Sequence, residues 1–225
     1  PDLYSKAKTL QKKFPDSAAI TVFEEEEAVH RADGTNVSRV REVIFLAKDE
    51  AKGNAEVWLS FDPNRETVRV LHARCYSPEG QVTSLAPDQI KISKGSSGGQ
   101  YFNQSQTVSF TIPNAEVGCL VDYAYEDEEF NPFDKQLFQG YSLFQTFSPV
   151  GKSVLRVTVP QNQDLFFTTR QCPAENASPS VTIENGRKTF QWSFSDMPPI
   201  VTEPSMPPLR EIAPGVAFCL QKDWT

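Results

Sequence analysis

The sequence has few of the residues and motifs on which catalysis usually depends. Its 225 residues include only two histidines, and its four cysteines stand too far apart to form a zinc knuckle or a redox pair. It contains no glycine-rich phosphate loop, no nucleotide-binding fingerprint and no His-Glu-x-x-His helix. These absences argue against the classes of enzyme that such motifs identify.

Long apolar runs and excess positive charge are also missing. No uninterrupted apolar run approaches the ~18 to 20 residues that cross a bilayer, so we expect a protein that does not span a membrane. The net charge of -7 argues against a nucleic-acid partner, because binding phosphates requires a basic surface. No Lys or Arg occurs between Lys94 and Lys135, and the seven acidic residues of that segment equal the whole net charge.

Most of the chain has an alternation of apolar and polar residues with period two, which indicates strands. The clearest alternating runs are residues 56–61, 107–112, 117–125 and 155–159, and a final strand is expected near residues 216–220. Asn185-Gly186 stands between two further runs and favours a tight hairpin, because both residue types adopt the left-handed turn that a hairpin needs. We therefore predict an all-β fold, an antiparallel β-sandwich of about a dozen strands.

The two ends of the chain differ from this pattern. Leu3, Ala7, Leu10 and Phe14 recur at helical spacing, so residues 1–14 predict one short N-terminal helix that is the possible end of an upstream helical segment. The β-sandwich domain should then cover residues 15–225. Within it, residues 197–214 contain six prolines, which predict an ordered strap without regular structure whose apolar side chains cover part of a sheet.

The nucleophiles of the sequence do not form a catalytic arrangement. His72 and Cys75 are close in sequence, but residues three apart on a strand point to opposite faces of the sheet. Cys119 lies between Val117 and Val121 and is expected in the core as a small apolar side chain. We therefore expect no enzymatic activity from this chain.

Two acidic runs are candidates for cation binding. The four glutamates Glu24 to Glu27 would place only two carboxylates on each face of a strand, which favours a solvated or edge strand over half of a cation site. Asp122, Glu126, Asp127 and Glu128 form a candidate calcium site, because calcium accepts flexible cages of oxygen ligands. The alternative for this second run is an acidic turn, since its spacing matches no known calcium loop.

Aromatic residues are dense between Tyr123 and Phe147. They either close one end of the sandwich or form an exposed patch that docks a neighbouring domain or a sugar. The residues assigned to this docking surface are Tyr125, Phe130, Phe133, Tyr141 and Trp224.

Several segments, in order, resemble a known family. The most specific are the turn Pro78-Glu79-Gly80 and the segment from Pro113 to Tyr123, with Glu116 and Gly118 at the expected spacing. Over most of residues 15–225 the chain resembles a β-sandwich domain of unknown function that stands before transglutaminase-like domains in many bacterial proteins. The resemblance implies that the Cys-His-Asp catalytic core lies in a downstream domain, with residues 221–225 at the boundary.

The resemblance also implies a function and a location. We expect a non-catalytic accessory or interaction domain of a bacterial transglutaminase-like, cysteine-protease-like protein, whose partner is the downstream domain of the same polypeptide. Proteins of this kind are commonly exported, so we expect the periplasm or cell envelope. The alternative is a carbohydrate-binding or adhesive β-sandwich module of the cell envelope. No cofactor is expected apart from calcium at the candidate site.

Overall fold

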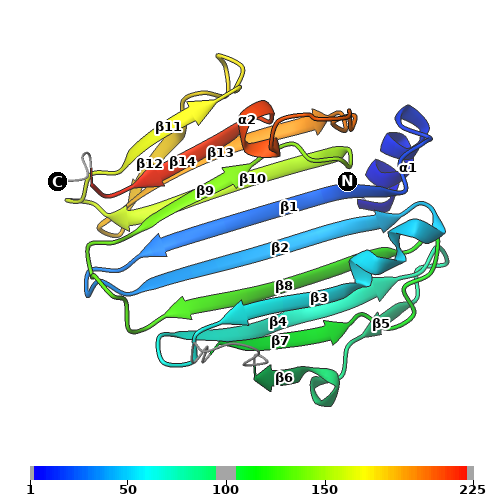
Figure 1. The fold of residues 1–225 in the computed structure, drawn as a ribbon, viewed down its shortest axis with the longest axis horizontal. Coiled ribbons are helices and arrows are strands. Elements are labelled where there is room, and N and C mark those ends of the chain that lie inside the picture. The colour runs from blue at the N-terminus through cyan, green and yellow to red at the C-terminus, as the bar shows by residue number, and fades with distance from the viewer. Residues whose placement is uncertain (1–2, 95–104, 222–225) are drawn as a thin grey trace.

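The computed structural model describes residues 3–94 and 105–221 (Figure 1). These residues form fourteen strands in three sheets. The large sheet has the order β12 (Ser180–Glu184), β13 (Arg187–Met197), β10 (Val150–Pro160), β1 (Ala19–His30), β2 (Asn36–Leu46), β8 (Leu120–Glu129), β4 (Glu66–Tyr76) and β5 (Val82–Ser84). One small sheet has the order β11 (Phe166–Arg170), β14 (Gly215–Cys219) and β9 (Gln139–Leu143), and the other has β3 (Glu56–Phe61), β7 (Gln106–Thr111) and β6 (Lys91–Lys94).

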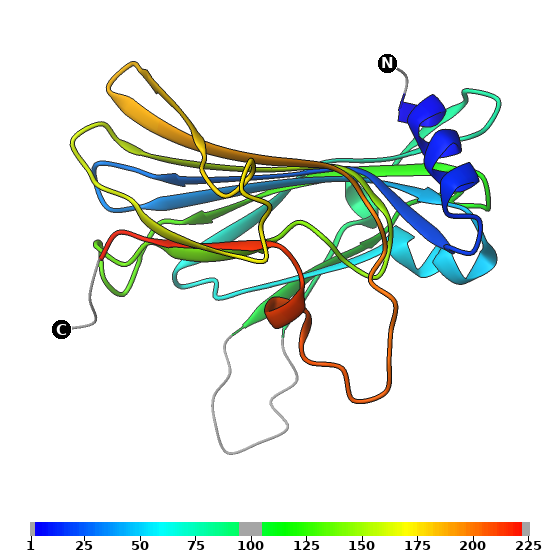
Figure 2. The same ribbon diagram turned by 90° about the horizontal axis from the view of Figure 1, so that it is seen from above.

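Both small sheets pack on the same face of the large sheet, which we name the inner face (Figure 2). Helix α1 (Leu3–Lys13) lies on the opposite, outer face. The remaining helical segments are η1 (Asp49–Ala55), η2 (Pro87–Gln89) and α2 (Leu209–Ile212). The prediction of an all-β sandwich with one short N-terminal helix is confirmed. Among the described strand pairs, β1 with β10 is parallel and the others are antiparallel.

Each small sheet is held by its own core. The first core lies between β3 and β7 and the strands β2, β8 and β4, and it contains Val57, Phe110, Val121 and Tyr123. The second core lies between β9, β14 and the strands β10 and β13; there Phe144 stacks on Phe194 with ring centroids 4.1 Å apart. The two cores are separate, so the middle of the inner face lies between the two small sheets.

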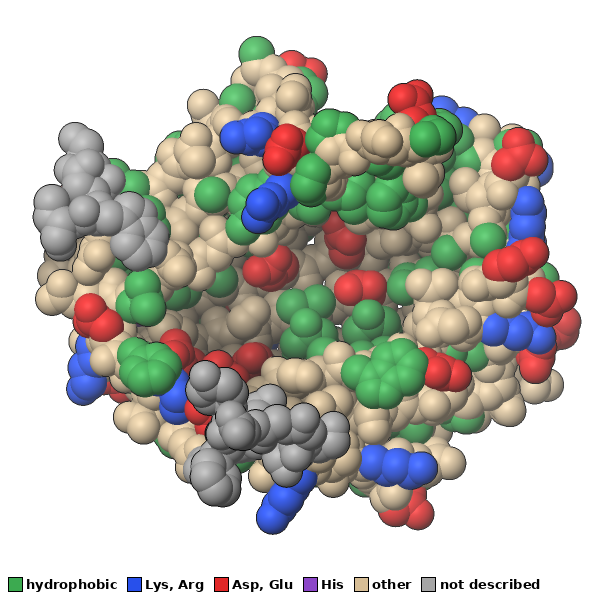
Figure 3. Space-filling view, in the orientation of Figure 1, with side chains coloured by type: hydrophobic (Ala, Val, Ile, Leu, Met, Phe, Trp, Pro, Cys, Tyr) green, Lys and Arg blue, Asp and Glu red, His purple; other side chains and the backbone are tan. Residues whose placement is uncertain are grey.

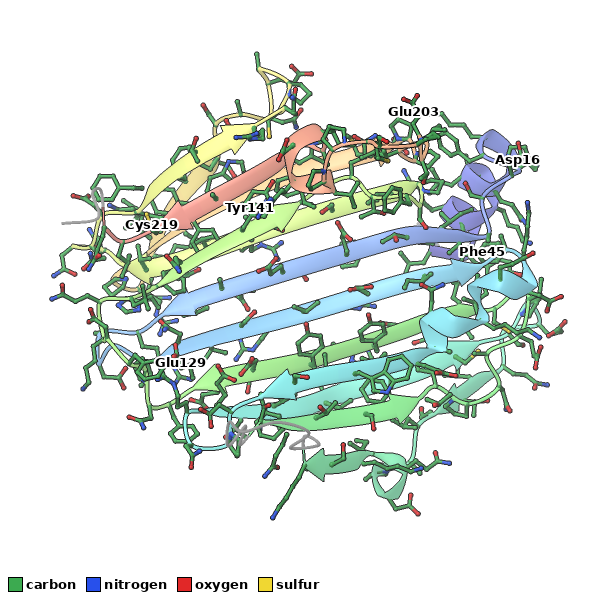
Figure 4. The ribbon with its side chains drawn as sticks, in the orientation of Figure 1. Asp16, Phe45, Glu129, Tyr141, Glu203 and Cys219 are labelled. Carbon is green, nitrogen blue, oxygen red and sulfur yellow. The ribbon has the colours of Figure 1, made fainter. Side chains whose placement is uncertain are left out.

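A third core joins α1 to the outer face. Ala7 and Leu10 of the helix are fully buried against Val22, Val43 and Phe45. Figure 4 shows Phe45 on β2 at the end of the sheet nearest α1. The helix predicted for residues 1–14 therefore packs on the sandwich through the apolar stripe that predicted it. Within the described part of the chain, no helix has the length and apolar character needed to cross a membrane.

The predicted hairpin at Asn185-Gly186 is confirmed. Both residues have a positive φ, 50° and 72°, and they connect β12 to β13. Val181 and Ile183 of β12 are nevertheless exposed, because β12 is the edge strand and extends past the second core.

The strand predicted from Val117 to Tyr125 begins later than expected. β8 starts at Leu120, and Gly118 has φ 90°, a conformation that a strand cannot continue. Its backbone N–H donates to the Leu46 carbonyl at 2.7 Å, so this stretch is a turn that anchors the entry to β8. Val117 is correspondingly exposed.

The proline-rich segment 197–214 matches the predicted strap only in part. After Met197, the last residue of β13, it is irregular except for α2. The Ile200 N–H donates to the Thr146 carbonyl, and the Gln145 side chain donates to the Pro198 carbonyl. Val201 is 76% exposed, and the segment extends away from the large sheet in Figure 2. The expectation that its apolar side chains cover a sheet is therefore wrong at Val201, because the prolines loop the chain outward.

Candidate functional site

The most distinctive feature of the inner face is a cleft between the two small sheets. Two cavities of about 300 Å³ and about 140 Å³ lie along it and share Glu26 as a lining residue. Figure 3 shows the hollow with acidic side chains at its bottom. We name it the acidic cleft and define its floor by the inward-facing carboxylates Glu24, Glu26, Glu42, Glu66 and Asp127.

Strand alternation places these acids on one face. In β1, Glu24 and Glu26 point inward, whereas Glu25 and Glu27 point outward to Arg156 and Arg39. Because β1 lies between β10 and β2, the expectation that this run forms an edge strand is wrong. The prediction of two carboxylates on each face is confirmed.

Burial without positive partners raises the pKa values of the cleft acids. Burial raises the pKa of Glu24 to about 7, although a hydrogen bond from Ser153 lowers it and the charges of Glu42 and Glu26 raise it further. Burial also raises the pKa of Glu26 and of Glu42, which accept hydrogen bonds from Ser142 and Tyr123. The lining residues of the two cavities include no Lys or Arg.

Asp127 of β8 has a similar environment at the other end of the cleft. Burial and the nearby charges of Glu66 and Glu129 raise its pKa to about 6. Its Oδ1 atom is buried and has no hydrogen-bond partner among the described residues. Glu129, labelled at the end of β8 in Figure 4, has hydrogen-bond donors that the Asp127 Oδ1 atom lacks, because Arg65 and Asn36 both donate to its carboxylate. The uncompensated negative charge is thus inside the cleft.

The outer face has the opposite arrangement, because its acids are paired with arginines. Arg41 donates two hydrogen bonds to Asp122, at 3.0 and 2.9 Å, and His72 Nε2 donates a third at 2.9 Å. Arg39 and Arg69 both donate to Glu126 in the same way. Burial alone would raise the pKa of Asp122, but these hydrogen bonds outweigh it and lower the pKa.

The structure does not bring the four calcium candidates together. Asp122, Glu126 and Glu128 point to the outer face, where each is paired with arginine, and Asp127 points into the acidic cleft. Among the described residues, no group of three or more His, Cys, Asp or Glu side chains could hold a metal ion.

The aromatic residues of the predicted docking surface lie on different elements. Tyr125 packs against the first core, and Tyr141 is on β9 of the far small sheet (Figure 4). Phe130 and Phe133 follow β8 and are 47% and 89% exposed. Phe133 lines the acidic cleft, with the Arg65 guanidinium 3.2 Å from its ring centroid. Trp224 lies outside the described residues.

The candidate nucleophiles are placed as the strand alternation predicted. His72 bonds to Asp122 on the outer face, whereas Cys75 is buried in the first core on the inner face. Cys119 is buried in the same core. The acidic cleft itself was not identified from sequence, because its carboxylates come from the β1–β2 hairpin and from β4 and β8, which lie further along the chain. The available signals were the two acidic runs, Glu24 to Glu27 and Asp122 to Glu129, because Glu24 and Glu26 of the first and Asp127 of the second lie on the cleft floor.

Comparison with solved structures supports the fold. A candidate protease from Parabacteroides distasonis superposes with a TM-score of 0.83 at 16% identity, over 91% of this chain and 41% of that chain. An M1 zinc metallopeptidase from Deinococcus radiodurans gives a TM-score of 0.43 at 15% identity, over 90% of this chain and 42% of that chain. The second likeness is too weak to carry an argument. The chain thus spans less than half the length of either structure.

Sequence comparison adds a family. No curated protein matches the chain. The model of a family described as a domain of unknown function with a solved structure matches residues 32–201, from the turn after β1 to the segment after β13. The match covers seven of the eight strands of the large sheet but not β1, which carries Glu24 and Glu26. Because it spans more than half of the chain, the chain belongs to this family, DUF3857.

Proposed function

We propose that this chain is a non-catalytic interaction domain of a bacterial transglutaminase-like, cysteine-protease-like protein. In this proposal the acidic cleft binds a positively charged segment of the neighbouring transglutaminase-like domain of the same polypeptide. The observation that carries it is the cleft floor, on which Glu24, Glu26 and Glu42 lie together while the lining residues include no Lys or Arg.

The charge of the cleft favours a cationic occupant. Carboxylates that are buried without positive partners have raised pKa values, so part of their charge is suppressed in the free protein. A Lys or Arg side chain would form charge-assisted hydrogen bonds with them and restore the ionised form. Binding should therefore release protons near pH 7 and become tighter as the pH rises from 5 to 8.

Two observations support a neighbouring domain as the source of that segment. The sequence resembles domains that stand before transglutaminase-like domains, from Pro113 to Tyr123 most specifically. The fold also recurs in 41% of a longer chain described as a candidate protease. The placement of His72 and Cys75 on opposite faces supports a role in binding rather than catalysis.

Binding in trans tests this function. The chain and the downstream domain of its polypeptide are produced separately, and their affinity is measured by isothermal titration calorimetry at pH 5 and pH 8. The triple variant Glu24→Gln, Glu26→Gln, Glu42→Gln should weaken binding at least tenfold at pH 8. The control is Glu184→Gln with Glu203→Gln, because both residues are exposed outside the cleft (Figure 4 labels Glu203). An unchanged affinity in the triple variant would refute the role of the cleft.

The location that the resemblance implies is part of the same proposal. Proteins of this kind are commonly exported, so we place the full-length protein in the periplasm or cell envelope. Cell fractionation with an antibody against this domain tests it, since recovery in the cytoplasmic fraction alone would contradict the assignment.

Carbohydrate binding is a second candidate function, favoured by one surface. Tyr141 and Phe166 line an open hollow of about 590 Å³ on the small sheet of β11, β14 and β9. Tyr141 is 43% exposed, and its hydroxyl donates to the Arg210 carbonyl, which fixes the ring. A glycan array tests this function. Binding that Tyr141→Ala removes would support it, and an array without hits would contradict it.

A further inference from the structure

Two of the four cysteines lie side by side in the first core. Cys75 is in β4, where it pairs with Val121 of β8, and Cys119 lies two residues before Val121. The Cys75 and Cys119 thiols are 3.1 and 3.8 Å from a common acceptor, the Asn114 carbonyl oxygen. Cys119 is also close enough to Cys75 to raise the pKa of the Cys75 thiol. Both side chains are buried, with 2% and 4% exposure.

We propose that Cys75 and Cys119 form a disulfide bond when the chain folds in the presence of a disulfide oxidant. The thiolate of one cysteine attacks the oxidant, forms a mixed disulfide and releases one thiol. The thiolate of the second cysteine then attacks the mixed disulfide, which forms the Cys75–Cys119 bond and releases the second thiol. Two protein thiols are oxidised, and one disulfide of the glutathione or protein-dithiol class is reduced to two thiols.

The bond forms during folding rather than in the folded protein. Thiolates carry out the exchange, and burial with the neighbouring Cys119 raises the pKa of the Cys75 thiol to about 12. An oxidant also cannot reach two sulfur atoms that are covered by the first core. The pair is therefore a structural disulfide site and differs from an exposed redox switch.

The other cysteines lack this geometry. Cys172 lies near the carbonyls of Arg170 and Gly215, whereas Cys219 donates to the Gln221 carbonyl. Figure 4 shows Cys219 on β14 in the far small sheet. No acceptor is common to these two thiols among the described hydrogen bonds, so we expect both to stay reduced.

The bond would fix the turn that leads into β8. The turn already receives a hydrogen bond from the Tyr4 hydroxyl to the Gly118 carbonyl and gives one from the Gly118 N–H to Leu46. A disulfide from Cys119 to β4 adds a covalent link and restricts the unfolded chain. We expect the melting temperature of the oxidised protein to be higher than that of the reduced protein by about 5 °C or more.

Mass spectrometry of the refolded chain tests the proposal. The unfolded, reduced protein is refolded with oxidised glutathione or with dithiothreitol, then denatured, alkylated and digested with trypsin. Trypsin places Cys75 in the peptide 75–91 and Cys119 in the peptide 95–135. The glutathione sample should contain these two peptides cross-linked and two alkylated cysteines, Cys172 and Cys219. Cys172→Ser should keep the cross-link, and Cys119→Ser should abolish it.

Two results would overturn the proposal. One is four alkylated cysteines in glutathione-refolded protein whose circular dichroism shows the native sheet. The other is a cross-link that involves Cys172 or Cys219. Neither result bears on the acidic cleft, because both measurements use the single chain without a partner.

Discussion

Glu24 of β1 and Glu42 of β2 are direct partners across the β1–β2 ladder and face each other on the floor of the acidic cleft. Like charges in this position are destabilising, because the side chains are only ~5 Å apart. The raised pKa of Glu24, to about 7, lowers this cost by keeping the carboxyl partly protonated near neutral pH. The charge of the cleft therefore depends on pH in the physiological range.

The first prediction is that Glu24→Gln stabilises the fold at pH 8 but not at pH 4.5. A carboxyl whose pKa is higher in the folded state stabilises the fold when protonated, and this contribution is lost as pH rises from 4.5 to 7. The shift corresponds to about 3 kcal/mol, which the variant should recover at pH 8. Urea unfolding at both pH values measures the difference. Equal differences at the two pH values would contradict the prediction, and Glu184→Gln is the exposed control.

The second prediction concerns the paired acid of the outer face. Asp122 is 3% exposed and accepts hydrogen bonds from Arg41 and His72. Asp122→Asn should lower the free energy of unfolding by about 3 kcal/mol at pH 7, because both donors lose a charged acceptor. Chemical denaturation measures the loss. Glu116→Gln, which breaks an exposed ion pair with Lys52, should change the stability very little.

The third prediction uses two glycines that both have open space around them. Gly186 has φ 72°, and a Cβ added there would meet nothing within 4 Å. Gly186→Ala should therefore cost about 1 kcal/mol through backbone strain alone. Gly53 has the same open surroundings without a positive φ, so Gly53→Ala should not destabilise the protein. Thermal unfolding compares the two variants, and equal effects would contradict the assignment of strain.

The sequence predicted best what is local. The turn at Asn185-Gly186 and the helical stripe of Ala7 and Leu10 depend on residues a few positions apart, and both are observed. The separation of His72 from Cys75 also followed from strand alternation alone. Each of these features is determined by backbone geometry within one element or one turn.

What depends on strand order was not predictable from sequence. Glu24 and Glu26 are in an interior strand because β10 returns alongside β1 in parallel, from more than a hundred residues away. The acidic cleft arises because the two small sheets pack apart from each other on one face. Periodicity gives the two faces of a strand but does not say which strands are neighbours. Asp127 is separated from Asp122 by alternation along β8, which continues to Glu129, four residues past the end of the predicted run.

The last prediction asks whether α1 is part of this domain. From the sequence, this helix could be the end of an upstream helical segment. In the structure, however, Leu10 is 2% exposed and packs in the third core with Phe45. If α1 belongs to the domain, Leu10→Ala should lower the free energy of unfolding by about 3 kcal/mol, because a cavity remains beside the large sheet. Lys12→Ala, on the exposed side of the same helix, should have almost no effect. Urea unfolding of the full chain measures both variants. Equal stability of Leu10→Ala and the unmodified chain would mean that the helix contributes nothing to the fold of the sandwich.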